Sequence, residues 1–169
     1  MSDFDTKENL SNFSSRQEPE GDLYLRFFIE SGEEFALSAM GIREVLSIGP
    51  DQITLIPNVS PLLMGVLNFR GQVIWVSDIG QFLGSNRSLN TERAEISVIV
   101  VEFQDIMIGL AVEQVKGMEW LSIENLSPLS NHVSDSMIPF LRGEWRGISE
   151  QSLRLLDAAS ILRSARWAA

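Results

Sequence analysis

Residues Pro61–Asp78 read PLLMGVLNFRGQVIWVSD, two apolar, β-favouring runs on either side of a short polar turn, Asn68-Phe69-Arg70-Gly71. The glycine of this turn can adopt a positive φ angle, so the segment predicts a β-hairpin. A guanidinium on a rigid turn suits the binding of a partner's carboxylate or carbonyl group. It cannot act as a general base, because arginine stays protonated. The turn therefore predicts recognition rather than catalysis, centred on Arg70.

Short apolar runs alternate with turn residues along the rest of the chain, which is typical of an all-β protein. The strands that we predict are Leu25–Ile29, Glu34–Ser38, Val45–Ile48, Gly65–Asn68, Val73–Val76, Ile96–Glu102, Met107–Ala111, Glu119–Leu121 and Leu153–Leu156. The stretch Ala158–Ala169 is rich in alanine, leucine and arginine and predicts a C-terminal helix. Residues 1–22 are polar and acidic, so we expect a disordered tail there and one folded region over residues 23–169.

The sequence contains an internal repeat. Phe35–Arg43 aligns with Ile108–Lys116 at an offset of 73 residues, and Pro61-x-x-x-Gly65 aligns with Pro139-x-x-x-Gly143 at an offset of 78. Two related all-β halves are the simplest account of this pattern. Because small closed sheets leave no free strand edges, we predict two small β-barrels packed side by side.

Both halves also place an aspartate directly after an apolar strand. Asp78 is followed by the apolar pair Phe82-Leu83, and Asp157 by Ile161-Leu162. An aspartate at the N-cap accepts hydrogen bonds from the free N–H groups of the first helical turn, and the next turn supplies buried side chains. We therefore predict a short capped helix at the end of each half, rather than a catalytic pair of carboxylates.

Composition excludes several classes of function. The chain has 169 residues, no cysteine and one histidine, so thiolate and histidine-rich metal sites are excluded and we expect neither a metal nor a cofactor. The net charge of −10 argues against nucleic acid and against an anionic membrane surface. We find no secretory signal and no apolar run long enough to span a membrane, so we expect a cytoplasmic chain without membrane insertion.

No group of residues supports catalysis. Ser77 lacks the Gly-x-Ser-x-Gly pattern and a histidine to activate it, and His132 lies in a polar loop. A hydrolase that uses Ser77, Asp78 or Asp157 therefore remains only a distant alternative, and we predict that the chain is not an enzyme.

A second candidate for partner binding is the segment Ile42-Arg43-Glu44-Val45. Its spacing favours Ile42 and Val45 as core residues, with Glu44 on the solvent face where it could contact a basic partner. The tryptophans Trp75, Trp120 and Trp145 are candidates for the core as well, although tryptophan is also enriched in interface hot spots.

Several of these motifs, taken in order, resemble the CheW family of chemotaxis coupling proteins. They are Leu25–Ile29, Glu34–Leu37, Ile42–Val45, Pro57–Gly71, Ile108–Val115 and Leu153–Asp157. The resemblance implies two intertwined, SH3-like, five-stranded β-barrel subdomains with short capping helices and a C-terminal helix.

The resemblance also implies a non-catalytic adaptor. Its partners would be the cytoplasmic tip of a methyl-accepting chemoreceptor and the regulatory domain of a CheA-type histidine kinase, in a two-component pathway for chemotaxis or a related taxis or pilus system. Arg70 matches the family's arginine at the receptor-facing junction, and its neighbours Asn68, Phe69 and Gly71 are further candidates for partner binding, although Phe69 replaces the usual leucine. Ile42, Glu44 and Val45 match a strand implicated in partner contact. The alternative from the residues themselves is a free-standing SH3-like module for an unrelated ligand, such as a proline-rich segment.

Overall fold

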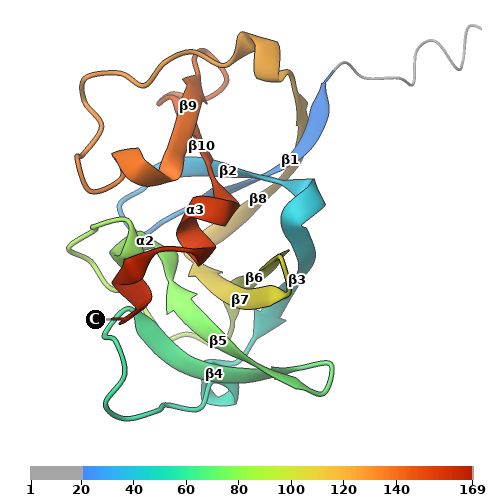
Figure 1. Ribbon diagram of the computed structural model, residues 1–169, viewed down its shortest axis with the longest axis vertical. Coiled ribbons are helices and arrows are strands. Elements are labelled where there is room, and N and C mark those ends of the chain that lie inside the picture. The colour runs from blue at the N-terminus through green and yellow to red at the C-terminus, as the bar shows by residue number, and fades with distance from the viewer. Residues whose placement is uncertain (1–20, 169) are drawn as a thin grey trace, which may run out of the picture.

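The computed structural model describes residues 21–168, which form two packed five-stranded sheets (Figure 1). In spatial order, the first sheet contains β8 (Gln114–Leu121), β1 (Asp22–Phe28), β2 (Glu34–Ser38), β10 (Leu153–Leu156) and β9 (Leu141–Trp145). The second contains β3 (Ile42–Ile48), β6 (Ile96–Phe103), β7 (Ile106–Val112), β5 (Gln72–Asp78) and β4 (Leu63–Phe69). We call the first the upper barrel and the second the lower barrel, after their places in Figure 1. The predicted tail lies outside the described residues, apart from residues 21 and 22.

The helices are short. The α-helices are α2 (Ile79–Phe82) and α3 (Ala158–Leu162), and the 3₁₀ turns are η1 (Ala39–Gly41), η2 (Pro50–Gln52), η3 (Ile123–Asn125), η4 (Ile138–Phe140) and η5 (Ala165–Ala168). No helix within residues 21–168 has the length and apolar content needed to cross a lipid bilayer.

The repeat governs the topology. Each strand of one half has a counterpart five strands away in the other half, so that β1 corresponds to β6 and β3 to β8. When every strand is exchanged for its counterpart, the strand order of one sheet becomes that of the other. Each barrel takes two strands from one half of the chain and three from the other, so the halves are intertwined. Parallel pairing at equivalent positions joins them, with Trp75 opposite Ile108 and Arg154 opposite Phe35. The mainly β, two-subdomain prediction is confirmed.

The two aspartates cap their helices as predicted. The Asp78 carboxylate accepts from the backbone N–H of Gln81, and the Asp157 carboxylate accepts from that of Ser160. In Figure 1 both α2 and α3 appear in the region between the two barrels. The apolar residues that follow each cap are buried in the central core, which draws on both sheets.

Two predictions about elements were wrong. Strand β9 was not predicted, because Arg142, Gly143 and Glu144 interrupt its apolar run, although Glu144 is buried in the fold. The C-terminal helix is not continuous either, since α3 ends at Leu162 and a separate 3₁₀ turn follows. Trp167 in that turn stacks on Phe82 at 4.3 Å between ring centroids, so a tertiary contact bends the chain back onto the core.

The tryptophans divide between core and surface. Trp145 is buried against Tyr24, whereas Trp75 and Trp120 are partly exposed. The latter two lie in strands whose neighbouring residues face the core, so the alternation of side chains turns both rings outward. The prediction of core burial was therefore right for one of the three.

The glycine of each Pro-x-x-x-Gly motif lies where the backbone of a neighbouring segment comes close. Gly65 has a φ angle of +147°, and a Cβ atom there would overlap the carbonyl oxygen of Thr54. Thr54 pairs with Val66 through two backbone hydrogen bonds of 2.8 and 2.9 Å. Gly143 has the same relation to Ser127 in the upper barrel.

We expect Gly65→Ala to lower the free energy of unfolding by ~2–4 kcal/mol, because the new methyl group must displace a paired backbone carbonyl. Gly117→Ala is a matched control, since Gly117 has a similar φ angle of +139° with nothing near the added Cβ. The control substitution introduces only backbone strain, so it should lower the free energy of unfolding by ~1 kcal/mol. Urea denaturation of both variants measures the difference, and equal losses would contradict the overlap with Thr54.

Candidate functional site

The β4–β5 hairpin turns on two residues, Arg70 and Gly71. Their φ angles are +51° and +79°, and Phe69 pairs with Gln72 across the turn, the geometry of a type I′ turn. The side-chain oxygen of Asn68 accepts a hydrogen bond of 3.1 Å from the backbone N–H of Gly71. The hairpin prediction is confirmed, but its turn is two residues shorter than the sequence segment suggested, and Phe69 is a buried strand residue.

Arg70 and Glu44 form a bidentate ion pair that joins the hairpin to β3. Arg70 Nε lies 3.3 Å from Glu44 Oε2, and Arg70 Nη2 lies 3.2 Å from Glu44 Oε1. The hydrogen bond to the Glu44 carboxylate and its charge raise the pKa of Arg70 further above its usual range. Since β3 and β4 are the outer strands of the lower sheet, this pair bridges the two strand edges of that barrel.

A groove of about 620 Å³ lies beneath this ion pair, and we call it the hairpin groove. Its lining residues come from β3, η2 and the β4–β5 hairpin: Glu44, Leu46, Ile48, Gln52, Leu67, Asn68, Phe69 and Arg70. The side chains deep in the groove are apolar, while the Arg70 side chain at its rim remains 72% exposed. The groove can therefore receive an apolar side chain while Arg70 binds a carboxylate or carbonyl of the same partner.

The structure places only part of the predicted segment Ile42–Val45 at this groove. A bulge between Ile42 and Glu44 shifts the register against β6, so Glu44 faces the groove and Ile42 packs against the central core. Val45 is 39% exposed on the other face, and the expectation that it is a core residue was wrong. The bulge changes which residues share a face, and spacing alone did not reveal it.

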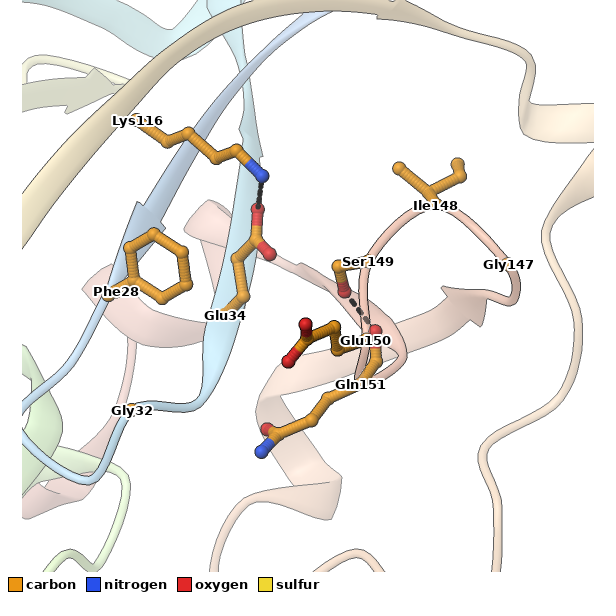
Figure 2. A pocket seen from close by; sticks show the side chains of 9 residues that line it. All are labelled: Phe28, Gly32, Glu34, Lys116, Gly147, Ile148, Ser149, Glu150 and Gln151. Carbon is orange, nitrogen blue, oxygen red and sulfur yellow. Dashed lines mark hydrogen bonds and ion pairs between the residues drawn. The ribbon is translucent and has the colours of Figure 1, made fainter.

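A second hollow, of about 490 Å³, lies at the upper barrel between the ends of β1 and β2, β8 and the β9–β10 loop (Figure 2). Lys116 Nζ lies 3.9 Å from Glu34 Oε1 and 5.9 Å from the centre of the Phe28 ring. Arg26 Nε also binds Glu34 Oε1, at 2.6 Å. These charged groups pair with one another, so we assign no ligand to this hollow.

The residues of the hydrolase alternative do not form a reaction centre. Ser77 is fully buried, and Asp78 and Asp157 serve as helix caps. Within residues 21–168 we find no cluster of three or more acidic or histidine side chains that could hold a metal ion.

One carboxylate pair was not predicted. Glu30, just after β1, has both carboxylate oxygens buried, and it lies near Asp78 and Glu113. Burial raises the pKa of Glu30 from 4.5 to about 7, with a further contribution from the negative charges of Asp78 and Glu113. Neither Glu30 nor Asp78 lines the grooves above, so this pair concerns stability.

The comparisons with known proteins agree with this fold. A family model described as "CheW-like domain" matches residues 24–166. The chain belongs to the CheW-like domain family. Protein PilI of Pseudomonas aeruginosa is 32% identical over 113 residues, which cover 66% of this chain and 61% of PilI. The probable chemotaxis protein CheW of Rhizobium etli is 30% identical over 124 residues, which cover 73% of this chain and 77% of that protein.

A solved structure has the same fold. The scaffolding protein TtCheW from Thermoanaerobacter tengcongensis superposes with a TM-score of 0.70 at 20% identity, over 86% of this chain and 95% of that one. CheW-like proteins are non-catalytic scaffolds of chemotaxis or pilus chemosensory pathways, so this chain is not an enzyme.

Sequence reasoning missed the apolar residues of the hairpin groove, Leu46, Ile48 and Leu67. Each lies in an apolar run that is also typical of core residues. The groove depends on the distance between β3 and β4, which the sequence does not show. The internal repeat could have indicated strand β9, because Gly143 aligns with Gly65 of β4.

In this CheW-like protein the raised pKa of Glu30 predicts a pH-dependent stability. The folded state holds the proton more tightly than the unfolded chain, so the free energy of unfolding falls as the pH rises from 4.5 to about 7. Glu30→Gln removes this loss. The free energy of unfolding of the variant, measured relative to that of wild type, should therefore rise by ~1–2 kcal/mol from about pH 5 to about pH 8, after allowance for solvent screening. Urea denaturation at both pH values measures this gain, and Glu92→Gln, at an exposed site, should show none.

Arg70 occupies a backbone conformation that asparagine adopts more readily, because its φ angle of +51° is unfavourable for a long side chain. We expect Arg70→Asn to raise the midpoint of thermal unfolding by ~2–4 °C, since an exposed ion pair stabilises little. Calorimetry measures this shift. A fall of similar size would instead mean that the pair with Glu44 holds the hairpin in place.

Proposed function

We propose that this chain is an adaptor that couples the cytoplasmic tip of a methyl-accepting chemoreceptor to the regulatory domain of a CheA-type histidine kinase. It would act in the cytoplasm at membrane-associated receptor arrays. Membership of the CheW-like family supports this proposal, as does the similarity to Protein PilI and to a probable chemotaxis protein CheW. The observation that carries it is the hairpin groove, in which apolar side chains lie beneath an exposed arginine on a rigid turn.

We propose further that the receptor contacts the hairpin groove. Receptor tips would insert an apolar side chain between Leu46 and Leu67, and Arg70 would orient that contact through a carboxylate or carbonyl of the receptor. Glu44 pairs with the guanidinium without burying it, and the two-residue turn fixes the backbone from which the Arg70 side chain extends. Phe69 is buried, so its part is to support Arg70, whose guanidinium lies 5.6 Å from the centre of its ring.

The adaptor would act by holding receptor and kinase in a fixed relative position and not by catalysing a reaction. A partner can shift the equilibrium between kinase states only by the difference in its affinity for them. A rigid two-barrel protein that binds receptor and kinase on separate surfaces would transmit such a difference. The intertwined strands support this, because neither barrel can move without disturbing strands from both halves of the chain.

Exchanging the charges of Arg70 and Glu44 tests whether Arg70 contacts the receptor directly or only stabilises the hairpin through its ion pair with Glu44. Arg70→Glu places two carboxylates together at the rim, and we expect it to reduce receptor-controlled kinase phosphorylation about tenfold or more while the protein stays folded. The double variant Arg70→Glu/Glu44→Arg restores an ion pair across the groove, but moves the guanidinium from the turn to β3. We expect it to remain defective.

The measurement is kinase autophosphorylation with receptor-containing membranes, kinase and each variant. Arg87→Glu, at an exposed arginine outside the groove, changes the net charge equally and should behave as wild type. Normal coupling by the double variant would reduce Arg70 to a brace. Normal coupling by Arg70→Glu would remove Arg70 from the proposal.

The alternative is a free-standing SH3-like module with an unrelated ligand, and one observation favours it. A mainly apolar hollow of about 430 Å³ is lined by Trp75, Ile106, Leu162 and Trp167, among others. An aromatic-lined hollow of this kind suits a proline-rich segment. Affinity purification from a lysate with solubilised membranes distinguishes the two functions. The adaptor should recover a kinase and a receptor together, while the module should recover neither and should bind proline-rich peptides with a change in tryptophan fluorescence.

A further inference from the structure

The upper barrel has a counterpart of the hairpin groove. It has a volume of about 420 Å³ and lies between β8, η3 and β9, and we call it the β8–β9 groove. The repeat relates the two grooves residue by residue, because Leu121 corresponds to Ile48, Trp145 to Leu67 and Ile148 to Arg70 at offsets of 73 to 78 residues.

The β8–β9 groove has lost the ion pair that covers its counterpart. Ile148 stands at the position of Arg70, and Gly117 at the position of Glu44, so no charge pair bridges the rim at these two positions. Instead, Trp120 of β8 lines the groove and is 49% exposed, beside Ile148 and the polar residues Ser122, Asn125 and Arg146. An exposed tryptophan beside an isoleucine can bind apolar side chains of an occupant, while the polar residues around them can bind its polar groups.

The N-terminal end of β1 lies at this groove. Asp22 pairs with Leu121, a residue of the groove, and a Cβ atom at Gly21 would overlap the carbonyl oxygen of Leu121. The folded region, to which residues 1–20 are joined at Gly21, therefore begins at the groove's edge. Residues 1–20, the N-terminal segment, include Leu10 and Phe13, and Phe13 precedes Gly21 by eight residues, which can span up to ~26–29 Å.

The charge of the segment also suits this position. Residues 1–20 contain five acidic and two basic side chains, and Glu18 and Glu20 lie closest to the folded region in sequence. Arg146 lines the groove, and its side chain is 62% exposed although it pairs with the buried Glu144 at 3.3 Å. A tethered segment also has a high effective concentration at its own groove, so weak apolar contacts suffice for occupancy.

We propose that the N-terminal segment docks in the β8–β9 groove, with Leu10 and Phe13 against Trp120 and Ile148. The segment would cover Trp120 and Ile148 at a groove whose counterpart in the lower barrel is covered by the ion pair of Arg70 with Glu44. This proposal is independent of the receptor and kinase proposed above, because it concerns two parts of one chain.

The absence of cysteine from the chain permits a direct test. A nitroxide spin label at Ser11→Cys in the full-length protein reports its distance to every amide through paramagnetic broadening of NMR signals. We expect broadening at the indole N–H of Trp120 and the amides of Arg146 and Ile148, and none at Arg70 and Gly71 of the hairpin groove, which serves as an internal comparison.

Tethering alone brings the label near the upper barrel for part of the time, so the matched control carries the same label with Leu10→Ser and Phe13→Ser. Docking predicts at least a twofold loss of broadening at Trp120 and Ile148 in this control. Trp120→Gln in the labelled protein should give the same loss. Equal broadening with and without the apolar side chains would overturn the proposal.

A mixed sample excludes a second copy as the occupant. Spin-labelled protein without ¹⁵N is mixed with ¹⁵N-labelled protein that carries no spin label. Docking within one chain predicts no broadening at Trp120 in this sample. Broadening there at the level of the singly labelled sample would assign the groove to a neighbouring molecule and overturn the intrachain proposal.

Discussion

Parallel pairing between the two halves of the chain is the constraint on which the rest of this structure depends. Strand β5 pairs with β7, and β10 with β2, at equivalent positions of the repeat. Strands β5 and β10 each lead directly into an aspartate that caps a short helix, and apolar residues of both helices are buried in the central core. Because each sheet contains strands from both halves, the two barrels and the central core depend on one another. The hairpin that carries Arg70 is part of the lower sheet and therefore depends on this pairing.

The two grooves show how a repeated scaffold acquires different surfaces. The glycine and backbone bridge that shape each barrel are retained in both halves, as Gly65 with Thr54 and Gly143 with Ser127 show. The side chains at the rim differ, since an arginine paired with Glu44 covers the lower groove while isoleucine and exposed tryptophan border the upper one. Such a protein can present unlike surfaces to unlike partners without altering its fold.

Much of the fold could be predicted because its signals are local. Alternating apolar runs located nine of the strands, and aspartate before an apolar pair located both capped helices. Prediction failed where a contact distant in sequence decided the outcome. Strand β9 buries Glu144 although its sequence is not typical of a strand, Trp167 folds back onto Phe82, and a bulge in β3 separates the faces of Ile42 and Glu44. In the candidate site, Arg70 and Glu44 were predicted individually, but not as partners.

The sequence by itself determined the β-hairpin, the repeat, the helix caps and the family, because each depends on residue types at short or regular spacing. Only the tertiary structure decided which strands share a barrel, that Arg70 meets Glu44 across 26 residues of chain, and that apolar side chains beneath them form a groove. The physical reason is that an ion pair or a groove depends on distances between surfaces, and those distances are set when strands from both halves pack together.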